Sequence, residues 1–372
     1  MSSILLFFGI LSTLVLIHEL GHFLAAKKSG VKVLEFGLGL PPKIIGKKFK
    51  DTIYSLNLLP FGGFVRLKGE EEAEVNDEDS FSTKSTKKRF FIIVAGVIMN
   101  FLLAIFIYQG MLMYSGFKSQ YIPMILDFKP VLGQLDVKEG VIGGFSEKTK
   151  LNPKDFTPGD YVYSVNGVLI SSENQIREEI NKSKGNKANV VFKNLKDVSL
   201  IKEFDVELIE DNGRKLMGIS LSNVGNLRYE GNLRYIAGLA HSINMISFTN
   251  SALVDLVGLA IKHNDSTIVT DNVSGPVGIY KVVDTISKDS QSIFSLELLN
   301  LVALLSLSLA FMNILPLPAL DGGRLVFVIY EMITRKKPNP KYELAVNKVG
   351  MILLLGMLVA VTFKDVSQLI SR

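Results

Sequence analysis

Four long apolar runs dominate the pattern of hydrophobic and polar positions along the chain. They cover residues 3–26, 90–114, 298–315 and 349–363, and the last run extends back to about residue 345. About 20 predominantly apolar residues in a helix are enough to cross a bilayer. We therefore expect four membrane-spanning helices. We do not expect the first run to be a signal peptide, because it lacks a basic start and ionisable residues interrupt it.

The segment from about residue 117 to 235 has a different pattern. Short β-like runs alternate there with Gly, Pro, Asn and Asp, and residues 173–181 fit a short helix. This pattern predicts one small α+β domain on the outer side of the membrane. The next stretch, residues 236–262, is apolar with few charges. It fits either a core helix of that domain or an amphipathic helix that lies on the bilayer surface.

The expected fold class is therefore a polytopic α-helical membrane protein with four spanning helices and an inserted α+β domain. Residues 1–116 would hold the first two spans and residues 117–235 the outer domain. An amphipathic helix and linker would occupy residues 236–294, and the last two spans would lie in residues 295–372.

Basic residues indicate how the chain crosses the membrane. Lys and Arg gather in residues 27–89 and 334–344, next to the ends of the apolar runs. Because cytoplasmic loops are enriched in Lys and Arg, the N-terminus and the outer domain should lie outside and residues 27–89 in the cytoplasm. The net charge of +5 then reports topology. We expect the lipid bilayer as a partner and no nucleic acid.

Composition removes several classes of site. The chain has no cysteine, which excludes disulfides, Cys-ligated zinc fingers and iron–sulfur clusters. It has 4 histidines, far fewer than a histidine-rich di-iron oxygenase needs. Hydrophobic residues make up 48% of the chain and the mean hydropathy is +0.30, yet 21% of residues are charged. A membrane protein with a substantial water-exposed part fits this balance.

One ionisable cluster lies inside the first apolar run. His18, Glu19 and His22 form an H-E-x-x-H motif. Residues four apart share one face of a helix, so both imidazoles can bind one zinc ion while Glu19 acts as general base. The alternative is a chance match. That alternative leaves three costly polar groups inside a membrane span without a compensating partner.

A zinc site of this kind needs a third protein ligand. We expect His241 and His263 to be surface or interfacial residues of the outer segment, away from the first span. Asp321 is the stronger candidate, because it follows a segment in which Pro316 and Pro318 break the third span. Broken backbone at membrane depth is tolerated where it lines a wet cavity. The alternative is an ordinary helix end with Asp321 capping the next helix.

The two motifs together resemble the site-2 protease family of intramembrane zinc metalloproteases, in its bacterial RseP/RasP-type branch. The resemblance covers nearly the whole chain and rests on H-E-L-G-H in the first span and N-I-L-P-L-P-A-L-D-G-G in the third. It implies that His18, His22 and Asp321 bind Zn2+ and that Glu19 is the general base. It also implies that Asn313 holds the substrate backbone near the scissile bond.

Residues 35–39 and 54–65 resemble the family's membrane-associated β-hairpin, with Gly37, Gly39, Gly62 and Gly63 as substrate-binding positions. An exposed strand edge can pair with an unwound substrate segment, and proteolysis needs that extended form. The alternative is an amphipathic hairpin that only packs on the helices. At the start of the second span, Val97 stands where the family usually has proline.

Residues 158–167 read P-G-D-Y-V-Y-S-V-N-G and resemble the core of a PDZ domain. The resemblance therefore implies one PDZ-like outer domain, which we expect to exclude untrimmed substrates. The resemblance to the site-2 protease family implies a bacterial inner (cytoplasmic) membrane protein that performs regulated intramembrane proteolysis. Its substrates would be single-pass proteins such as anti-sigma factors or remnant signal peptides. The alternative function is a non-catalytic membrane scaffold that presents the PDZ-like domain.

Overall fold

The computed structural model describes residues 2–70, 77–124, 128–197, 199–211, 213–265, 267–270, 274–289 and 295–370. The chain divides into two compact units. A helical unit contains Met1–Tyr114 and Tyr235–Arg372, and a second unit contains Ser115–Arg234. We call the second unit the outer unit because it corresponds to the segment that the sequence predicts to lie outside. We describe each unit by itself.

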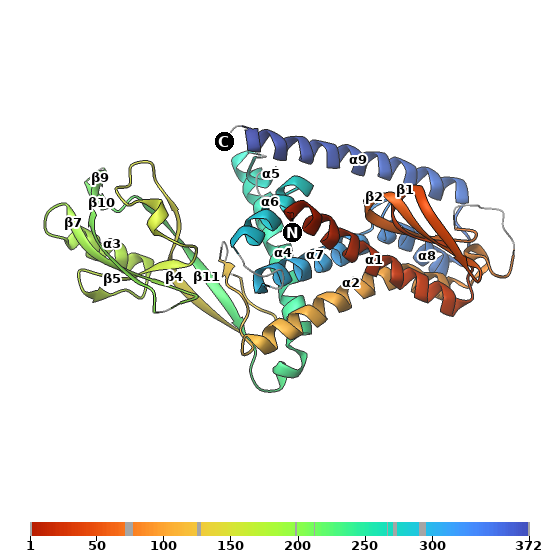
Figure 1. Ribbon diagram of the computed structural model, residues 1–372, viewed down its shortest axis with the longest axis horizontal. Coiled ribbons are helices and arrows are strands. Elements are labelled where there is room, and N and C mark those ends of the chain that lie inside the picture. Colours follow the sequence, from red (N-terminus) through yellow and green to blue (C-terminus); the bar gives the residue numbers. More distant parts are fainter. Residues whose placement is uncertain are drawn as a thin grey trace. The chain divides into compact units, whose positions relative to one another are not determined.

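Eight α-helices lie in the described part of the helical unit (Figure 1). They are α1 (Ser3–Ser29), α2 (Thr86–Tyr114), α4 (Ala237–His263), α5 (Thr267–Thr270), α6 (Pro276–Asp289), α7 (Leu296–Ile314), α8 (Asp321–Thr334) and α9 (Pro340–Ile370). The four expected spans correspond to α1, α2, α7 and α9. The chain is thus a multi-pass membrane protein, in which α2 packs against both α1 and α7.

Among the described residues, five helices are long and apolar enough to cross a membrane, one more than we expected. The additional candidate includes α4, which we had placed in the outer domain or on the bilayer surface. Its first turns bury His241, Ser242 and Asn244 within the helical unit, and Gly238 N donates to Gln109 Oε1 of α2 at 2.7 Å. Buried polar residues lowered the apparent hydrophobicity of this segment.

The stretch after α4, which we expected to be a linker, contains helix α6. Val283 of α6 is fully buried, and Tyr280 packs edge-on against Phe7 of α1 with ring centroids 5.9 Å apart. The apolar residues of α6 therefore form one face that covers α1. Residues 266, 271–273 and 290–294 of the expected linker lie outside the described residues.

Small residues set the spacing between α1 and α2. A Cβ added at Gly21 would lie 2.3 Å from the carbonyl oxygen of Ala95, so only glycine lets the two backbones approach this closely. Within a bilayer, helix association depends on such close packing, because lipid tails are as apolar as the helix surfaces. Gly21 belongs to the H-E-L-G-H motif, so the motif also encodes the helix contact that holds it in place.

A β-hairpin follows α1 and consists of β1 (Val33–Phe49) and β2 (Thr52–Leu67). Both strands bend, so that four segments lie side by side. In order across the sheet they are 63–67, 33–38, 53–56 and 45–49, all paired antiparallel. One face of the sheet covers the end of α1, where Phe23 meets Phe36 and Tyr54 at ring-centroid distances of 5.2 and 6.2 Å. Residues 63–67 form a free edge among the described residues.

The outer unit is built around an antiparallel sheet with strand order β3-β11-β4-β5-β7-β8, and β6 pairs with β5. The strands are β3 (Ile122–Pro123), β4 (Gln134–Phe145), β5 (Asp160–Val165), β6 (Val168–Leu169), β7 (Lys187–Asn194), β8 (Ile201–Glu207) and β11 (Ile219–Arg228). The hairpin β9 (Ile209–Asp211) and β10 (Arg214–Leu216) lies beside α3 (Glu173–Lys182). Ile176 and Ile180 of α3 complete a core with Val162, Val190 and Phe192.

The P-G-D segment of the outer unit has a structural role. Asp160 is buried and accepts hydrogen bonds from Lys202 Nζ at 2.6 Å, Asn194 Nδ2 at 2.7 Å and the Thr157 amide at 2.9 Å. Burial alone would raise the pKa of Asp160, but the ion pair with Lys202 and the hydrogen bonds outweigh it and lower that pKa. The carboxylate therefore stays charged and joins the start of β5 to β7 and β8.

Candidate metal centre

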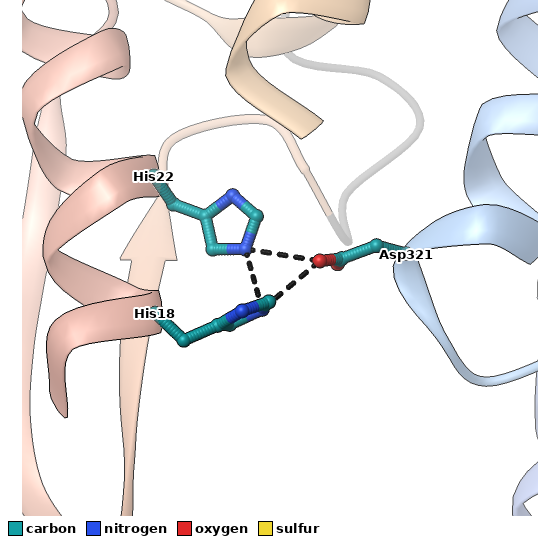
Figure 2. Close-up of side chains that lie close together, drawn as sticks. All are labelled: His18, His22 and Asp321. Carbon is teal, nitrogen blue, oxygen red and sulfur yellow. Dashed lines mark hydrogen bonds and ion pairs between the residues drawn. The ribbon is translucent and has the colours of Figure 1, made fainter. Parts of the chain in front are cut away.

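The two histidines of the motif point the same way from α1. His18 and His22 are buried, and their Nε2 atoms lie 3.1 Å apart (Figure 2). This arrangement follows from the four-residue spacing on a regular helix.

Asp321 reaches the same point from the other end of the chain. Its Oδ2 atom lies 3.0 Å from His18 Nε2 and 3.2 Å from His22 Nε2 (Figure 2). The backbone carrying it is irregular because α7 ends at Ile314 and α8 begins only at Asp321. The N-cap of α8 is Leu320, so Asp321 is not a simple capping residue.

Helix α9 supports this irregular segment. The amide of Ala319, which has a positive φ of 70°, donates to Asn347 Oδ1 of α9 at 3.2 Å. A Cβ at Gly350 would lie 2.2 Å from Cβ of Pro318, so α9 packs directly on the broken backbone. Exposed backbone groups at membrane depth must be satisfied by protein or water. Here α9 supplies part of that protein support.

The donor set fits a divalent cation. His22 Nδ1 lies 2.8 Å from the carbonyl oxygen of Ile92, which accepts its proton and leaves Nε2 free to bind metal. The three candidate ligand atoms form a triangle with sides of 3.0, 3.1 and 3.2 Å. Zinc bonds of about 2.0–2.1 Å at tetrahedral angles place ligand atoms about 3.3 Å apart. The lone pairs of the two Nε2 atoms and the Asp321 carboxylate oxygen face one another and repel. A cation between them removes this repulsion.

Helix α2 forms the back wall of this cluster. A Cβ at Gly96 would lie 2.4 Å from His22 Nε2 and 2.8 Å from His18 Nε2. Gly96 therefore leaves the room that the two imidazoles occupy. Asn100 is fully buried one turn further on, with its amide nitrogen 3.5 Å from His18 Nδ1.

Asn100 lies where it can orient His18 for metal binding. Zinc on Nε2 requires the proton on Nδ1, and amide oxygen and nitrogen are interchangeable in such assignments. Asn100 Oδ1 has no hydrogen-bond partner among the described residues. With the amide turned over, Oδ1 accepts the Nδ1 proton and both groups are satisfied.

Replacing Asn100 tests this arrangement. We expect Asn100→Ala to weaken zinc binding by roughly 10–100-fold, because His18 loses the group that fixes its tautomer and ring orientation. Competition with a chelator of known affinity measures the change. Asn100→Asp, which keeps the acceptor, should retain most of the affinity. Equal zinc affinity in Asn100→Ala and the unmutated chain would contradict the assigned role.

Glu19 lies beside the metal ligands and touches the hairpin. Its Oε2 atom accepts the backbone N–H of Val65 at 3.1 Å, and a Cβ at Gly63 would lie 3.7 Å from its Cγ. Val65 and Gly63 belong to the free edge 63–67 of the sheet. The general-base candidate, the metal ligands and a strand edge thus meet at one place.

The other residues singled out from the sequence lie at different distances from this place. Gly37 and Gly39 are on the adjacent strand segment, where a Cβ at Gly37 would lie 2.4 Å from the ring of Phe64. Gly62 precedes the free edge with a positive φ of 81°. Asn313 lies in the last turn of α7 and is half-buried. No hydrogen bond joins Asn313 to the cluster among the described residues.

The remaining histidines lie outside the cluster. The expectation that His241 is a surface or interfacial residue is wrong, because it is only 4% exposed and packs on Tyr108 of α2 at a ring-centroid distance of 4.5 Å. His263 is exposed at the end of α4. Among described residues, one group of at least three His or acidic side chains has the spacing for a metal ion, namely His18, His22 and Asp321.

Gly96 and Asn100 match family positions at the start of the second span, and Glu70 begins an acidic run, but the sequence assigned none of the three a role at the site, where the structure places them. Gly96 and Asn100 lie four apart on one face of the second span, so their shared face was a usable signal. Glu70 follows the hairpin directly and carried no such signal.

Comparison with known proteins agrees with this geometry. The family model for peptidase family M50 matches residues 6–357. The chain is 34% identical over 355 residues to a Clostridium perfringens protein provisionally named a zinc metalloprotease, covering 95% of this chain and 96% of that one. It is 28% identical over 459 positions to the zinc metalloprotease RasP of Shouchella clausii, covering both chains fully. It is also 28% identical over 454 positions to the regulator of sigma-W protease RasP of Bacillus subtilis, covering 99% of each. The chain therefore belongs to peptidase family M50, the site-2 protease family of zinc metalloproteases.

Proposed function

We propose that this chain is a zinc-dependent intramembrane endopeptidase that cleaves single-pass membrane proteins. One observation carries the proposal. His18, His22 and Asp321 converge on one point, and Glu19 beside them is hydrogen-bonded to a free strand edge. A hydrolytic site needs the ligands, the base and a place for an extended substrate together. In this proposal His18, His22 and Asp321 are the zinc ligands and Glu19 is the catalytic base.

The chemistry follows from the roles of these side chains. Bound zinc supplies a Lewis acid that activates water and polarises the scissile carbonyl group. Glu19 takes the proton from the attacking water and passes it to the leaving amine, which lets one carboxylate act as base and then acid. Its current partner, the Val65 amide, then becomes free to pair with substrate.

The substrate is proposed to bind as a strand. A helix hides its peptide bonds, so a membrane-spanning substrate must unwind before cleavage. The free edge 63–67 offers backbone groups for such a segment, in the manner of strand addition. Gly62 and Gly63 carry no side chains that could block an approaching substrate strand. Gly37 and Gly39 lie on the neighbouring strand segment and support the edge from there. We assign the half-buried Asn313 to the substrate backbone on the opposite side.

The outer unit is proposed to be a PDZ-like domain that admits only substrates with shortened outer portions. The topology proposed from the basic residues places it outside the inner (cytoplasmic) membrane, with residues 27–89 in the cytoplasm. Because the Bacillus subtilis relative is named a regulator of sigma-W protease, we propose anti-sigma factors and remnant signal peptides as substrate classes. A non-catalytic scaffold would need none of the convergence seen at the metal centre.

Cleavage by the purified chain tests the proposal. The full chain in detergent or nanodiscs, loaded with zinc, should cleave a model single-span protein inside its apolar segment. The fragments are identified by mass spectrometry. A zinc-loaded, folded chain that binds such substrates through residues 115–234 and never cleaves them would support the scaffold instead.

A further inference from the structure

Two carboxylates already occupy the free edge of the hairpin. Glu19 Oε2 accepts the N–H of Val65 at 3.1 Å, and Glu70 Oε2 accepts the N–H of Leu67 at 3.4 Å. Residues two apart on a strand direct their N–H groups to the same side. The amides of Val65 and Leu67 therefore point outward, as does that of Gly63, and those of Val65 and Leu67 each have an acidic partner.

The two carboxylates differ in how they are held. Glu19 is needed for proton transfer and must leave Val65 when it acts. Glu70 is fixed from the other side, because its Oε1 is ion-paired and hydrogen-bonded with Arg324 Nη1. Arg324 lies one turn after Asp321 on α8. Its side chain is 37% exposed and that of Glu70 only 18%, so the pair is partly shielded from water.

The pair also joins two parts of the site. Glu70 follows the last residues of β2, whereas Arg324 belongs to the helix that begins with a metal ligand. This ion pair links the end of β2 directly to α8. The pair therefore helps to position the strand edge relative to the metal centre, together with the bond from Val65 to Glu19.

We propose that Glu70, held by Arg324, is a specificity-determining residue that ends the substrate-binding edge at Leu67. This proposal rests on the proposed function. With the Leu67 amide occupied, a substrate strand pairs only up to Val65, and one register is fixed. A strand that slips by one residue turns its side chains to the opposite face, so the next permitted register differs by two residues. Blocking Leu67 therefore selects which peptide bond lies over the metal centre.

The test compares cleavage positions in the zinc-loaded full chain with one single-span substrate. We expect Glu70→Ala and Arg324→Ala to give a second cleavage site displaced by two residues, detected by the masses of the fragments. The specificity constant at the original site should fall by about ten-fold, as expected for loss of a charged hydrogen bond. The double variant should behave like either single variant, since the two residues act as a unit.

Conservative and control variants separate specificity from damage to the fold. Glu70→Gln keeps an acceptor for Leu67, and Arg324→Lys keeps the positive charge, so both should keep the single cleavage site. Lys68→Ala removes ion pairs with Asp77 and Asp79 close to the same strand without touching either partner. It should leave the cleavage position unchanged.

Two outcomes would overturn the inference while leaving the proposed function intact. One is a single, unchanged cleavage site in both alanine variants when the unmutated chain cleaves. The other is an equal displacement in Lys68→Ala. By contrast, absence of cleavage by the unmutated zinc-loaded chain would refute the proposed function itself. Zinc content, measured on every variant, shows that the metal centre remains intact.

Discussion

Substituting Glu19 with glutamine is expected to reduce substrate cleavage by about 10³-fold while zinc stays bound. A positioned general acid–base contributes about 10²–10⁴ to a hydrolytic rate, and Glu19 is the carboxylate beside His18 and His22. Gln is nearly the same size and can still accept the Val65 amide. The variant therefore loses proton transfer, while the side chain at position 19 keeps its hydrogen bond to the Val65 amide. Single-turnover cleavage of a single-span substrate in nanodiscs measures the change.

The control for this variant is Asp255→Asn. Asp255 is an exposed acidic residue of α4, so its replacement also removes one negative charge from the helical unit. It should leave cleavage unchanged. Cleavage by Glu19→Gln at the rate of the unmutated chain, with zinc retained, would remove Glu19 from the mechanism.

The second large effect is expected at Gly96. Any side chain there needs the space of the imidazoles, because its Cβ would lie 2.4 Å from His22 Nε2. The two helices cannot move apart easily to make room, because that would break the close backbone contact of α1 and α2 at Gly21. We expect Gly96→Ala to lower zinc affinity by more than about 100-fold, beyond the usual effect of a residue that only orients a ligand. Metal content after dialysis, together with cleavage, measures it.

A glycine of the same helix provides the matched control. Gly110 of α2 has no heavy atom within 4 Å of an added Cβ. Gly110→Ala should therefore keep zinc and activity, and it should stabilise the helix by up to about 1 kcal/mol. Normal zinc affinity in Gly96→Ala would show that the histidines do not occupy the positions described here.

Local spacing made part of the metal centre predictable. His18, Glu19 and His22 are close in sequence, and a regular helix alone determines their relative positions. Asp321 was inferred because the chain offers no cysteine, and the structure places it at the same point. The third ligand could be proposed from the broken backbone before it, although no local rule specified the contact.

The contacts around the ligands could not be predicted in the same way. Gly96 and Asn100 matter only because α2 lies against α1, and Glu70 matters only because α8 lies near the end of β2. These contacts join residues far apart in the chain, so they depend on packing and not on local pattern. The folding back of both hairpin strands is a further example, since it depends on bends that the apolar pattern does not reveal.

The count of spanning helices failed for a related reason. His241, Ser242 and Asn244 reduced the hydrophobicity of α4, so the segment resembled a surface helix. In the structure these residues are buried within the helical unit, and His241 packs on Tyr108 of α2. A polar side chain inside a span is tolerated when it faces other helices.

The bond from Gly238 to Gln109 pins the start of α4 against α2 close to the point where the chain leaves the helical unit. The chain thus leaves the helical unit after Tyr114 and re-enters it at Tyr235, close to two residues that are hydrogen-bonded to each other. Whatever is inserted between them starts and ends at two helices that are already bonded to each other. Residues 115–234 can then be lengthened, exchanged or duplicated while the ends of the two flanking helices stay together.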